Sequence, residues 1–115
     1  MRVIIAGSRT IHDRAKIVTA VQLSKFKITE VVCGMAPGVD MLGYEWARKH
    51  QLPIARFPAN WKKNGRRAGF LRNVEMVNYA DAAILVWDQK SRGTKSTLDL
   101  AQRKGIPVYL VRVAL

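Results

Sequence analysis

Three glycine-containing junctions carry the residues whose types and spacing could do chemistry. Each follows an apolar segment and leads into a helix-like one: Ala6–Thr10, Gly34–Asp40 and Ser91–Thr97. Glycine allows the backbone to approach a ligand closely, and a helix N-terminus offers unpaired N–H groups with a partial positive charge. Such a junction suits phosphate or another anion. Three of them in 115 residues predict a nucleotide-like small molecule as the ligand.

Polar side chains in and near these junctions are the candidates for contacts with that ligand. Arg9 can hold a phosphate through two parallel hydrogen bonds, a geometry that lysine does not reproduce. For Asp88 a ligand contact and a simple turn cap are both compatible with the sequence, and for Thr94 and Ser96 the alternative is helix capping. The predicted ligand-binding residues are Gly7, Ser8, Arg9, Gly34, Gly38, Asp40, Arg67, Arg72, Asn73, Asp88, Gly93, Thr94 and Ser96.

Asp40 is the candidate catalytic residue, should the protein be an enzyme. It follows Gly38-Val39 at the expected start of a helix, where an aspartate commonly caps the backbone N–H groups. Its carboxylate could also accept a hydrogen bond from a ribose hydroxyl or a base, or act as a general acid or base. Because the helix dipole favours the charged form, we expect this carboxylate to stay ionised.

The segment Pro58–Gly69 is the most basic part of the chain. It holds four cations, one aromatic side chain at Trp61 and two glycines, and we expect it to be the longest loop, without secondary structure. A lid over an anionic ligand, with Trp61 stacked on a base, is one interpretation. A surface for single-stranded nucleic acid is the other, because cations interleaved with aromatic residues are typical of such surfaces.

The composition is that of a globular protein with an unusual charge. The net charge of +12 favours anionic partners, whether nucleic acid or a phosphorylated small molecule. The longest apolar runs have the length of strands, so we expect no membrane span. A single cysteine, Cys33, excludes an internal disulfide and fits a reducing cytoplasm. Two distant histidines and no Cys-x-x-Cys pair argue against a zinc site, and no cofactor or metal is expected.

The hydrophobic pattern that must position these residues alternates between strand and helix along one domain, residues 1–115. Strands rich in valine, isoleucine and leucine, separated by helix-length segments, predict a parallel sheet of about five strands with helices on both faces. In open parallel sheets ligands bind beyond the carboxyl ends of the strands, where all three junctions would lie. The expected strands are 2–6, 30–33, 54–57, 82–87 and 107–113, and the expected helices are 13–25, 40–50, 69–79 and 96–104.

The order of the motifs resembles the YspA/YpsA-related branch of the SLOG superfamily, named for the Smf, DprA and LOG proteins. The resemblance implies a three-layer, Rossmann-like domain that binds nucleotides or nucleotide-derived molecules, and it points to self-association as a homodimer. It extends from about Val3 to Val111. The motifs that carry it are Gly7-Ser8-Arg9, Val31-Val32-Cys33-Gly34-x-x-x-Gly38-Val39-Asp40, Phe57-Pro58-Ala59-x-Trp61, Arg66-Arg67-Ala68-Gly69, Arg72-Asn73 and Arg92-Gly93-Thr94.

One departure from the superfamily bears on activity. Its phosphoribohydrolases carry Pro-Gly-Gly-x-Gly-Thr-x-x-Glu, in which the glutamate takes part in cleaving the N-glycosidic bond. Aligned on Gly93-Thr94, this chain has Lys90-Ser91 in place of the paired glycines and Thr97 in place of the glutamate. Nucleotide binding is therefore the first functional hypothesis. The alternatives are N-glycosidase or phosphoribohydrolase activity on nucleoside phosphates, and nucleic-acid binding through the basic surface.

Overall fold

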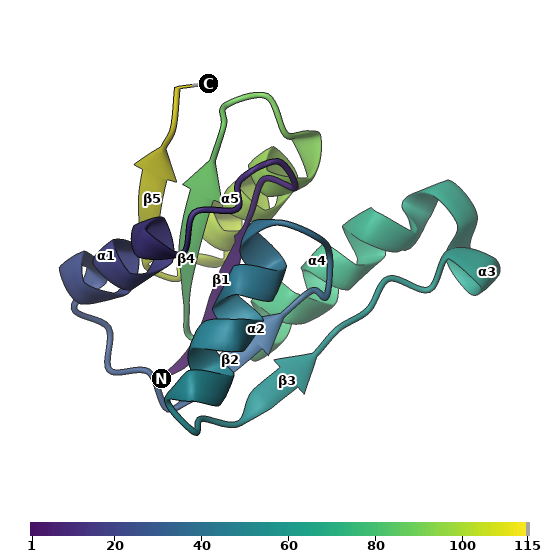
Figure 1. The fold of residues 1–115 in the computed structure, drawn as a ribbon. Coiled ribbons are helices and arrows are strands. Elements are labelled where there is room, and N and C mark those ends of the chain that lie inside the picture. Colours follow the sequence, from purple (N-terminus) through teal and green to yellow (C-terminus); the bar gives the residue numbers. More distant parts are fainter. Residues whose placement is uncertain (115) are drawn as a thin grey trace.

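The computed structural model describes residues 1–114 and contains one five-stranded sheet between layers of helices (Figure 1). The strand order is β3-β2-β1-β4-β5, and every neighbouring pair is parallel. This confirms the expected Rossmann-like α/β fold. The strands are β1 (Arg2–Gly7), β2 (Glu30–Cys33), β3 (Ile54–Arg56), β4 (Ala82–Trp87) and β5 (Val108–Arg112).

Helices cover both faces of the sheet. Val3 and Ile5 of β1 belong to the hydrophobic cluster that includes α1 and α2, whereas Ile4 and Ala6 belong to the cluster that includes α4 and α5. This alternation follows from the two-residue period of a strand. The helices are α1 (Arg14–Ser24), α2 (Val39–Lys49), α3 (Trp61–Asn64), α4 (Ala68–Tyr79) and α5 (Arg92–Lys104), with a 3-10 turn η1 (Gly65–Arg67) between α3 and α4.

Local signals in the sequence explain several helix ends. The Asp13 side chain accepts a hydrogen bond from the N–H of Ala15 at 3.0 Å and so caps α1. Gly105 ends α5 in the left-handed conformation that glycine commonly adopts after a helix. In α1 the side chain of Ile17 is buried, whereas that of Val18 is exposed. Neighbouring residues of a helix do not share a face.

The segment 58–69 is not the unstructured loop that its composition predicts. It contains α3 and η1, and α4 already begins at Ala68. The Asn60 side chain accepts a hydrogen bond from the N–H of Lys63 at 3.1 Å and so starts α3, which ends at Gly65 with a φ of 57°. The last helix also begins earlier than predicted, at Arg92, because Ser91 caps it.

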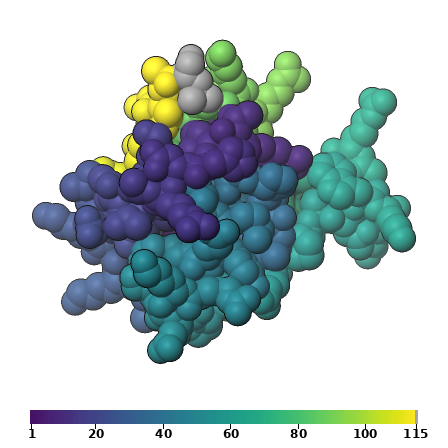
Figure 2. Space-filling model, viewed as in Figure 1, coloured from purple at the N-terminus to yellow at the C-terminus, as the bar shows by residue number. Residues whose placement is uncertain are grey.

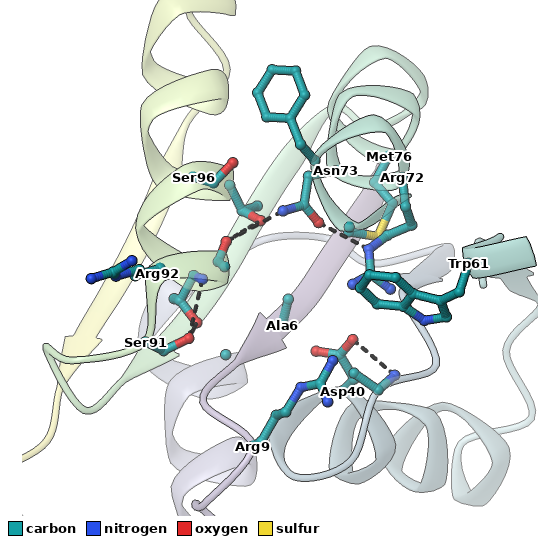
Figure 3. A pocket seen from close by; sticks show the side chains of 17 residues that line it. Ala6, Arg9, Asp40, Trp61, Arg72, Asn73, Met76, Ser91, Arg92 and Ser96 are labelled. Atoms are coloured by element: carbon teal, nitrogen blue, oxygen red, sulfur yellow. Dashed lines mark hydrogen bonds between the residues drawn. The ribbon is translucent and has the colours of Figure 1, made fainter. Parts of the chain in front are cut away.

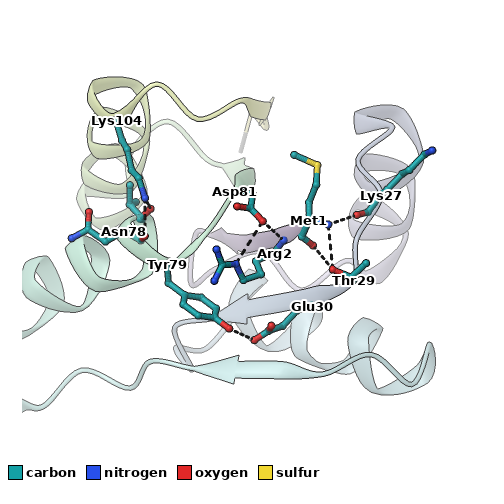
Figure 4. A network of polar contacts seen from close by, with 10 residues as sticks. Met1, Arg2, Lys27, Thr29, Glu30, Asn78, Tyr79, Asp81 and Lys104 are labelled. Carbon is teal, nitrogen blue, oxygen red and sulfur yellow. Dashed lines mark hydrogen bonds and ion pairs between the residues drawn. The ribbon is translucent and has the colours of Figure 1, made fainter.

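Polar contacts hold the amino edge of the sheet together (Figure 4). The amino group of Met1 donates to the carbonyl oxygen of Lys27 at 2.8 Å. The N–H of Arg2 donates to the Asp81 carboxylate, also at 2.8 Å. These bonds attach the start of β1 to the segments that lead into β2 and β4. The polar groups at this edge are engaged with one another, whereas the opposite edge is hollowed.

The strand order places that hollow edge at a topological switch point. From β1 the chain proceeds to β2 and β3 on one side, whereas β4 leads to β5 on the other. The connections that leave β1 and β4 therefore diverge, and the crevice between them is where open α/β sheets bind ligands. Within residues 1–114 no helix is both long enough and apolar enough to cross a membrane.

Candidate functional site

A cavity of about 400 Å³ lies over the carboxyl ends of β1 and β4 (Figure 3). Its size is within the range of pockets that hold small molecules and cofactors. The walls come from the β1–α1 loop, the start of α2, the α3–α4 segment and the first turns of α5. The lining residues are Ala6, Gly7, Arg9, Ala36, Asp40, Trp61, Gly69, Phe70, Arg72, Asn73, Met76, Ser91, Arg92, Gly93, Thr94, Ser96 and Thr97.

Ser8 holds together three elements beneath the cavity. It is fully buried, its N–H donates to the carbonyl oxygen of Val86 at 3.1 Å, and its own carbonyl accepts from the N–H of Val39 at 3.2 Å. Its hydroxyl accepts from the N–H of Asp88 at 2.9 Å. Gly38 must be a glycine here, because its φ is +81° and a Cβ would lie 2.4 Å from the Ser8 carbonyl oxygen. Both residues shape the floor.

Asp40 is the second residue of α2, and its position corrects the expectation that it caps this helix. Gly38, not Asp40, occupies the N-cap. The Asp40 side chain is 5% exposed and points into the cavity (Figure 3), and one carboxylate oxygen accepts from the N–H of Ala36 at 3.3 Å. Burial raises the carboxyl pKa to about 6, although the Ala36 N–H, Arg72 and Arg9 act in the opposite direction. Desolvation thus outweighs these favourable contacts.

A chain of hydrogen bonds joins three connections around the cavity. The Arg72 guanidinium donates to the carbonyl oxygen of Gly34 and, through Nε, to the side-chain oxygen of Asn73 at 3.0 Å. The Asn73 amide donates to the carbonyl oxygen of Gly93 at 3.3 Å, and the Thr97 hydroxyl donates to the same oxygen at 3.1 Å. Arg72 is therefore held in place before any ligand arrives. Partial burial lowers its pKa, but an arginine remains charged.

The first turn of α5 presents donors toward the same space. The Ser91 hydroxyl accepts from the N–H of Thr94 at 3.3 Å, whereas among residues 1–114 the N–H groups of Arg92 and Gly93 have no hydrogen-bond partner. The hydroxyl oxygen of Ser96 is buried, also without a partner in the described part of the chain. These groups could all donate to an anion at the helix N-terminus.

Cations and aromatic rings complete the walls. Arg9 comes from the β1–α1 loop, Arg72 from α4 and Arg92 from α5. Beside them the side chains of Trp61 and Phe70 are 54% and 50% exposed. A smaller cavity of about 220 Å³ shares Arg9, Ala36, Trp61 and Arg72 with the first. Its remaining lining residues are Gly34, Met35, Pro37, Pro58 and Ala59.

The structure brings together most, but not all, of the predicted site residues. Arg67 and Asp88 line neither cavity: Arg67 is exposed in η1, and the Asp88 carboxylate accepts from the N–H groups of Lys90 and Ser91 at 2.8 Å. Ser8 and Gly38 lie beneath the floor. The predicted residues that line the larger cavity are Gly7, Arg9, Asp40, Arg72, Asn73, Gly93, Thr94 and Ser96, and Gly34 lines the smaller one.

Sequence reasoning did not select several residues of the larger cavity. Arg92 stands next to Gly93 in a motif already noted, so its charge was a usable signal. Serine is one of the residues preferred at a helix N-cap, so the type of Ser91 was also a usable signal. Ala36, Phe70 and Met76 carry no chemical signal, and only the packing of α4 against the loops shows that they face the site. Trp61 was predicted to stack on a base in one interpretation of its segment, but it was not among the predicted ligand-binding residues.

Comparison with known proteins identifies the family. Residues 1–64 match the YAcAr family, described as the YspA, cpYpsA-related SLOG family. The chain belongs to this SLOG family. It is also similar to the gene 61 protein of Mycobacterium phage D29. The two sequences are 35% identical over an alignment of 117 positions, which covers 93% of each chain. No solved structure gives a significant match.

Membership in the SLOG family implies a nucleotide-related ligand in general terms. The matched segment contains the β1 and β2 junctions and Trp61, whereas Arg72, Asn73 and the α5 residues lie beyond it. Within residues 1–114 no group of three or more histidine, cysteine, aspartate or glutamate side chains is arranged to hold a metal ion. Asp40 is the sole carboxylate among the residues that line the two cavities of this SLOG protein.

Proposed function

We propose that this protein binds a nucleotide or a nucleotide-derived small molecule in the larger cavity. The observation that carries the proposal is the convergence of Arg9 from the β1–α1 loop, Arg72 from α4 and Arg92 from α5 on one cavity at the switch point of the sheet. Guanidinium groups bind phosphate through paired hydrogen bonds. Family membership supports the same class of ligand.

Two ends of the cavity suit different parts of such a ligand. The free N–H groups of Arg92 and Gly93 and the buried Ser96 hydroxyl favour a phosphoryl group at the start of α5. The exposed rings of Trp61 and Phe70 offer a surface on which a base can stack. Thus the anionic and aromatic parts of one nucleotide each have a matching wall.

Asp40 has a distinct role in this proposal. A carboxylate that faces an anion-binding cavity repels phosphate, so it must meet a neutral part of the ligand. Because its carboxyl pKa is about 6, most of it is ionised at neutral pH and accepts hydrogen bonds. A ribose hydroxyl or a base N–H is the matching donor. We infer that Asp40 selects ligands that present such a group.

Thermal unfolding against a panel of nucleotides, including ADP-ribose and cyclic nucleotides, tests the proposal. A ligand at 100 times its Kd adds about 2.7 kcal/mol of stability, which raises the Tm of a domain of this size by roughly 10 °C. Inorganic sulfate at equal ionic strength controls for the net charge. No shift with any nucleotide would overturn the proposal.

A matched pair of arginine variants places the ligand. Arg72→Gln removes a guanidinium from the cavity and should abolish most of the shift. Arg103→Gln removes the same charge from the last turn of α5, at the opposite edge, and should leave the shift intact. Equal losses in both variants would show that overall charge, and not the cavity, determines binding.

The buried Asp40 favours a second candidate, hydrolysis of an N-glycosidic bond in a nucleoside phosphate. Water adds to the anomeric carbon, the base departs with a proton, and a carboxylate stabilises the positive charge or activates the water. Thr97, which aligns with the phosphoribohydrolase glutamate, is 2% exposed, and its hydroxyl donates a hydrogen bond to the Gly93 carbonyl oxygen. Asp40 alone, with its raised pKa, could serve as the acid or base.

Product analysis separates binding from turnover. Nucleoside monophosphates are incubated with the protein, and free base is measured by chromatography. Catalysis predicts that Asp40→Asn abolishes base release while the thermal shift persists. If the native protein releases no base from any of the nucleotides it binds, the hydrolase candidate is wrong and the binding proposal stands.

A further inference from the structure

The segment Trp61–Arg67, which comprises α3 and η1, forms a basic lobe that projects from the body of the molecule. In Figure 1 α3 lies beyond the end of α4, away from the sheet, and Figure 2 shows the same part as a protrusion. None of the residues of α3 or η1 is buried. Hydrophobic packing therefore does not account for the side chains of the basic lobe.

The basic lobe carries four exposed and uncompensated cations. Lys62, Lys63, Arg66 and Arg67 make no ion pair within the described residues, where the ion pairs join other segments. The charge of the surroundings reinforces them: residues 46–74 contain eight lysines and arginines and no aspartate or glutamate. Such a concentration of one sign creates a positive field directed at anionic partners. The four lobe cations do not line the larger cavity.

Aromatic rings border these cations. Trp61 begins the lobe and Phe70 follows it in α4, and both rings are at least half exposed. Large exposed rings beside unpaired cations match the surfaces that bind single-stranded nucleic acid, in which bases stack on aromatic side chains while cations follow the phosphates. A duplex keeps its bases stacked on one another and would leave these rings unused.

We propose that the basic lobe binds single-stranded nucleic acid through four cations that lie outside the nucleotide cavity, while sharing the ring of Trp61 with that cavity. The phosphate backbone contacts Lys62, Lys63, Arg66 and Arg67, and an unstacked base covers Trp61. The backbone contacts carry no sequence information, so the binding is independent of base sequence. The inference does not depend on which small molecule occupies the cavity.

Fluorescence anisotropy with a labelled single-stranded oligonucleotide, measured over a range of salt concentrations, tests the proposal. The lobe variant replaces Lys62, Lys63, Arg66 and Arg67 with glutamine. Its matched control replaces four exposed cations near the amino edge of the sheet, Lys25, Lys27, Lys49 and Arg103, so both proteins lose the same charge. Circular dichroism checks that both remain folded.

The lobe variant should lose at least about tenfold in affinity, and its log–log salt slope should fall by roughly 2 to 3, since each single-strand phosphate contact contributes about 0.7. The control variant should stay within about threefold of the native protein. Equal losses in the two variants would overturn the proposal, because they would assign the binding to net charge. A native protein that binds no oligonucleotide at 50 mM salt would overturn it as well.

Stacking and partner class are tested by two further comparisons. Trp61→Ala should weaken single-strand binding about fivefold or more, while Trp61→Phe retains most of it, because a stacked base contributes through the ring face. Equal binding of duplex DNA or of polyglutamate with the same number of charges would contradict the proposal, since neither presents unstacked bases.

The lobe proposal and the cavity proposal can be tested independently. The four-site lobe variant should keep the thermal shift with nucleotides, and Arg72→Gln should keep oligonucleotide affinity. If Arg72→Gln abolishes oligonucleotide binding and the lobe variant does not, the strand occupies the cavity and the lobe proposal is wrong. If no nucleotide stabilises the protein while the lobe variant still loses oligonucleotide affinity, the cavity proposal fails and the lobe proposal stands.

Discussion

The side-chain amide of Asn73 donates a hydrogen bond to the carbonyl oxygen of Gly93 at 3.3 Å and so links α4 to the first turn of α5. Asn73 is 5% exposed, and its own oxygen accepts from Nε of Arg72. One buried amide therefore positions both the guanidinium and the helix N-terminus that face the larger cavity. We therefore expect Asn73 to contribute both to the stability of the fold and to the geometry of the candidate site.

Asn73→Ala should lower the free energy of unfolding by about 1–3 kcal/mol, because it removes the amide from between Arg72 and the Gly93 carbonyl in a buried setting. Asn78→Ala, at an exposed position of the same helix, should change it by less than about 0.5 kcal/mol. Urea denaturation of both variants measures the difference. Equal effects would mean that the Asn73 bonds contribute no net stability.

Asp40→Asn should stabilise the protein at neutral pH. Burial raises the carboxyl pKa from 3.8 to about 6, so between these values the native state binds more protons than the unfolded state. Native stability therefore falls as pH rises through this window, by about 3 kcal/mol in all. Asparagine does not ionise, so the variant should gain about 1–3 kcal/mol on the native protein above pH 6, and less near pH 4.

Urea unfolding at pH 4, 5, 6 and 8 measures this gain. Asp99→Asn, which removes a partly exposed carboxylate paired with Lys95, controls for the change in net charge and should show a small difference at every pH. A stability difference between Asp40→Asn and the native protein that does not vary with pH would contradict the raised pKa.

Two glycines of the larger cavity should respond oppositely to alanine. A Cβ on Gly7 would lie 2.0 Å from the carbonyl oxygen of Val86, a backbone atom of β4 that has little freedom to move. Gly7→Ala should therefore cost about 3 kcal/mol or more. A Cβ on Gly93 meets no described atom within 4 Å, so Gly93→Ala should be neutral or stabilising by up to about 1 kcal/mol. Thermal denaturation compares them, and a tolerated Gly7→Ala would contradict the packing at this junction.

Cys33 should be unreactive in the folded protein. The side chain is fully buried, and this burial raises the thiol pKa to about 11, so the reactive thiolate is scarce at pH 8. Iodoacetamide should label the native protein far more slowly than the unfolded chain in guanidinium chloride. Because the chain has one cysteine, mass spectrometry reads the result directly. Rapid labelling of the native protein would show that the end of β2 opens easily.

The strands were predictable because their signal is local. β2 and β4 have the predicted ends, β1 and β3 differ by one residue at one end, and β5 is one residue shorter at each end. Continuous apolar runs between turn residues indicate buried parallel strands irrespective of what packs on them. The caps at Asp13 and Gly105 were equally local, since each depends on the residue itself and its nearest neighbours.

The segment 58–69 shows where local reasoning fails. Its lysines, arginines and glycines favour a loop, but the Asn60 cap starts α3, and Trp61 approaches Gly69, whose Cβ position is 3.6 Å from the ring. A capping bond between residues three apart and a contact between residues eight apart together outweigh composition. A helix as short as α3 is not stable in isolation, so it also depends on contacts with the rest of the protein.

The sequence by itself determined the strand segments and the positions of the glycine-containing junctions, because an apolar run and the turn residues that end it belong to a few consecutive residues. Only the tertiary structure decided that Arg72 lies beside Asp40, that burial raises the pKa of Asp40, and that Arg67 and Asp88 lie away from the two cavities. Burial and charge proximity arise from residues distant in the chain, and no local pattern encodes them.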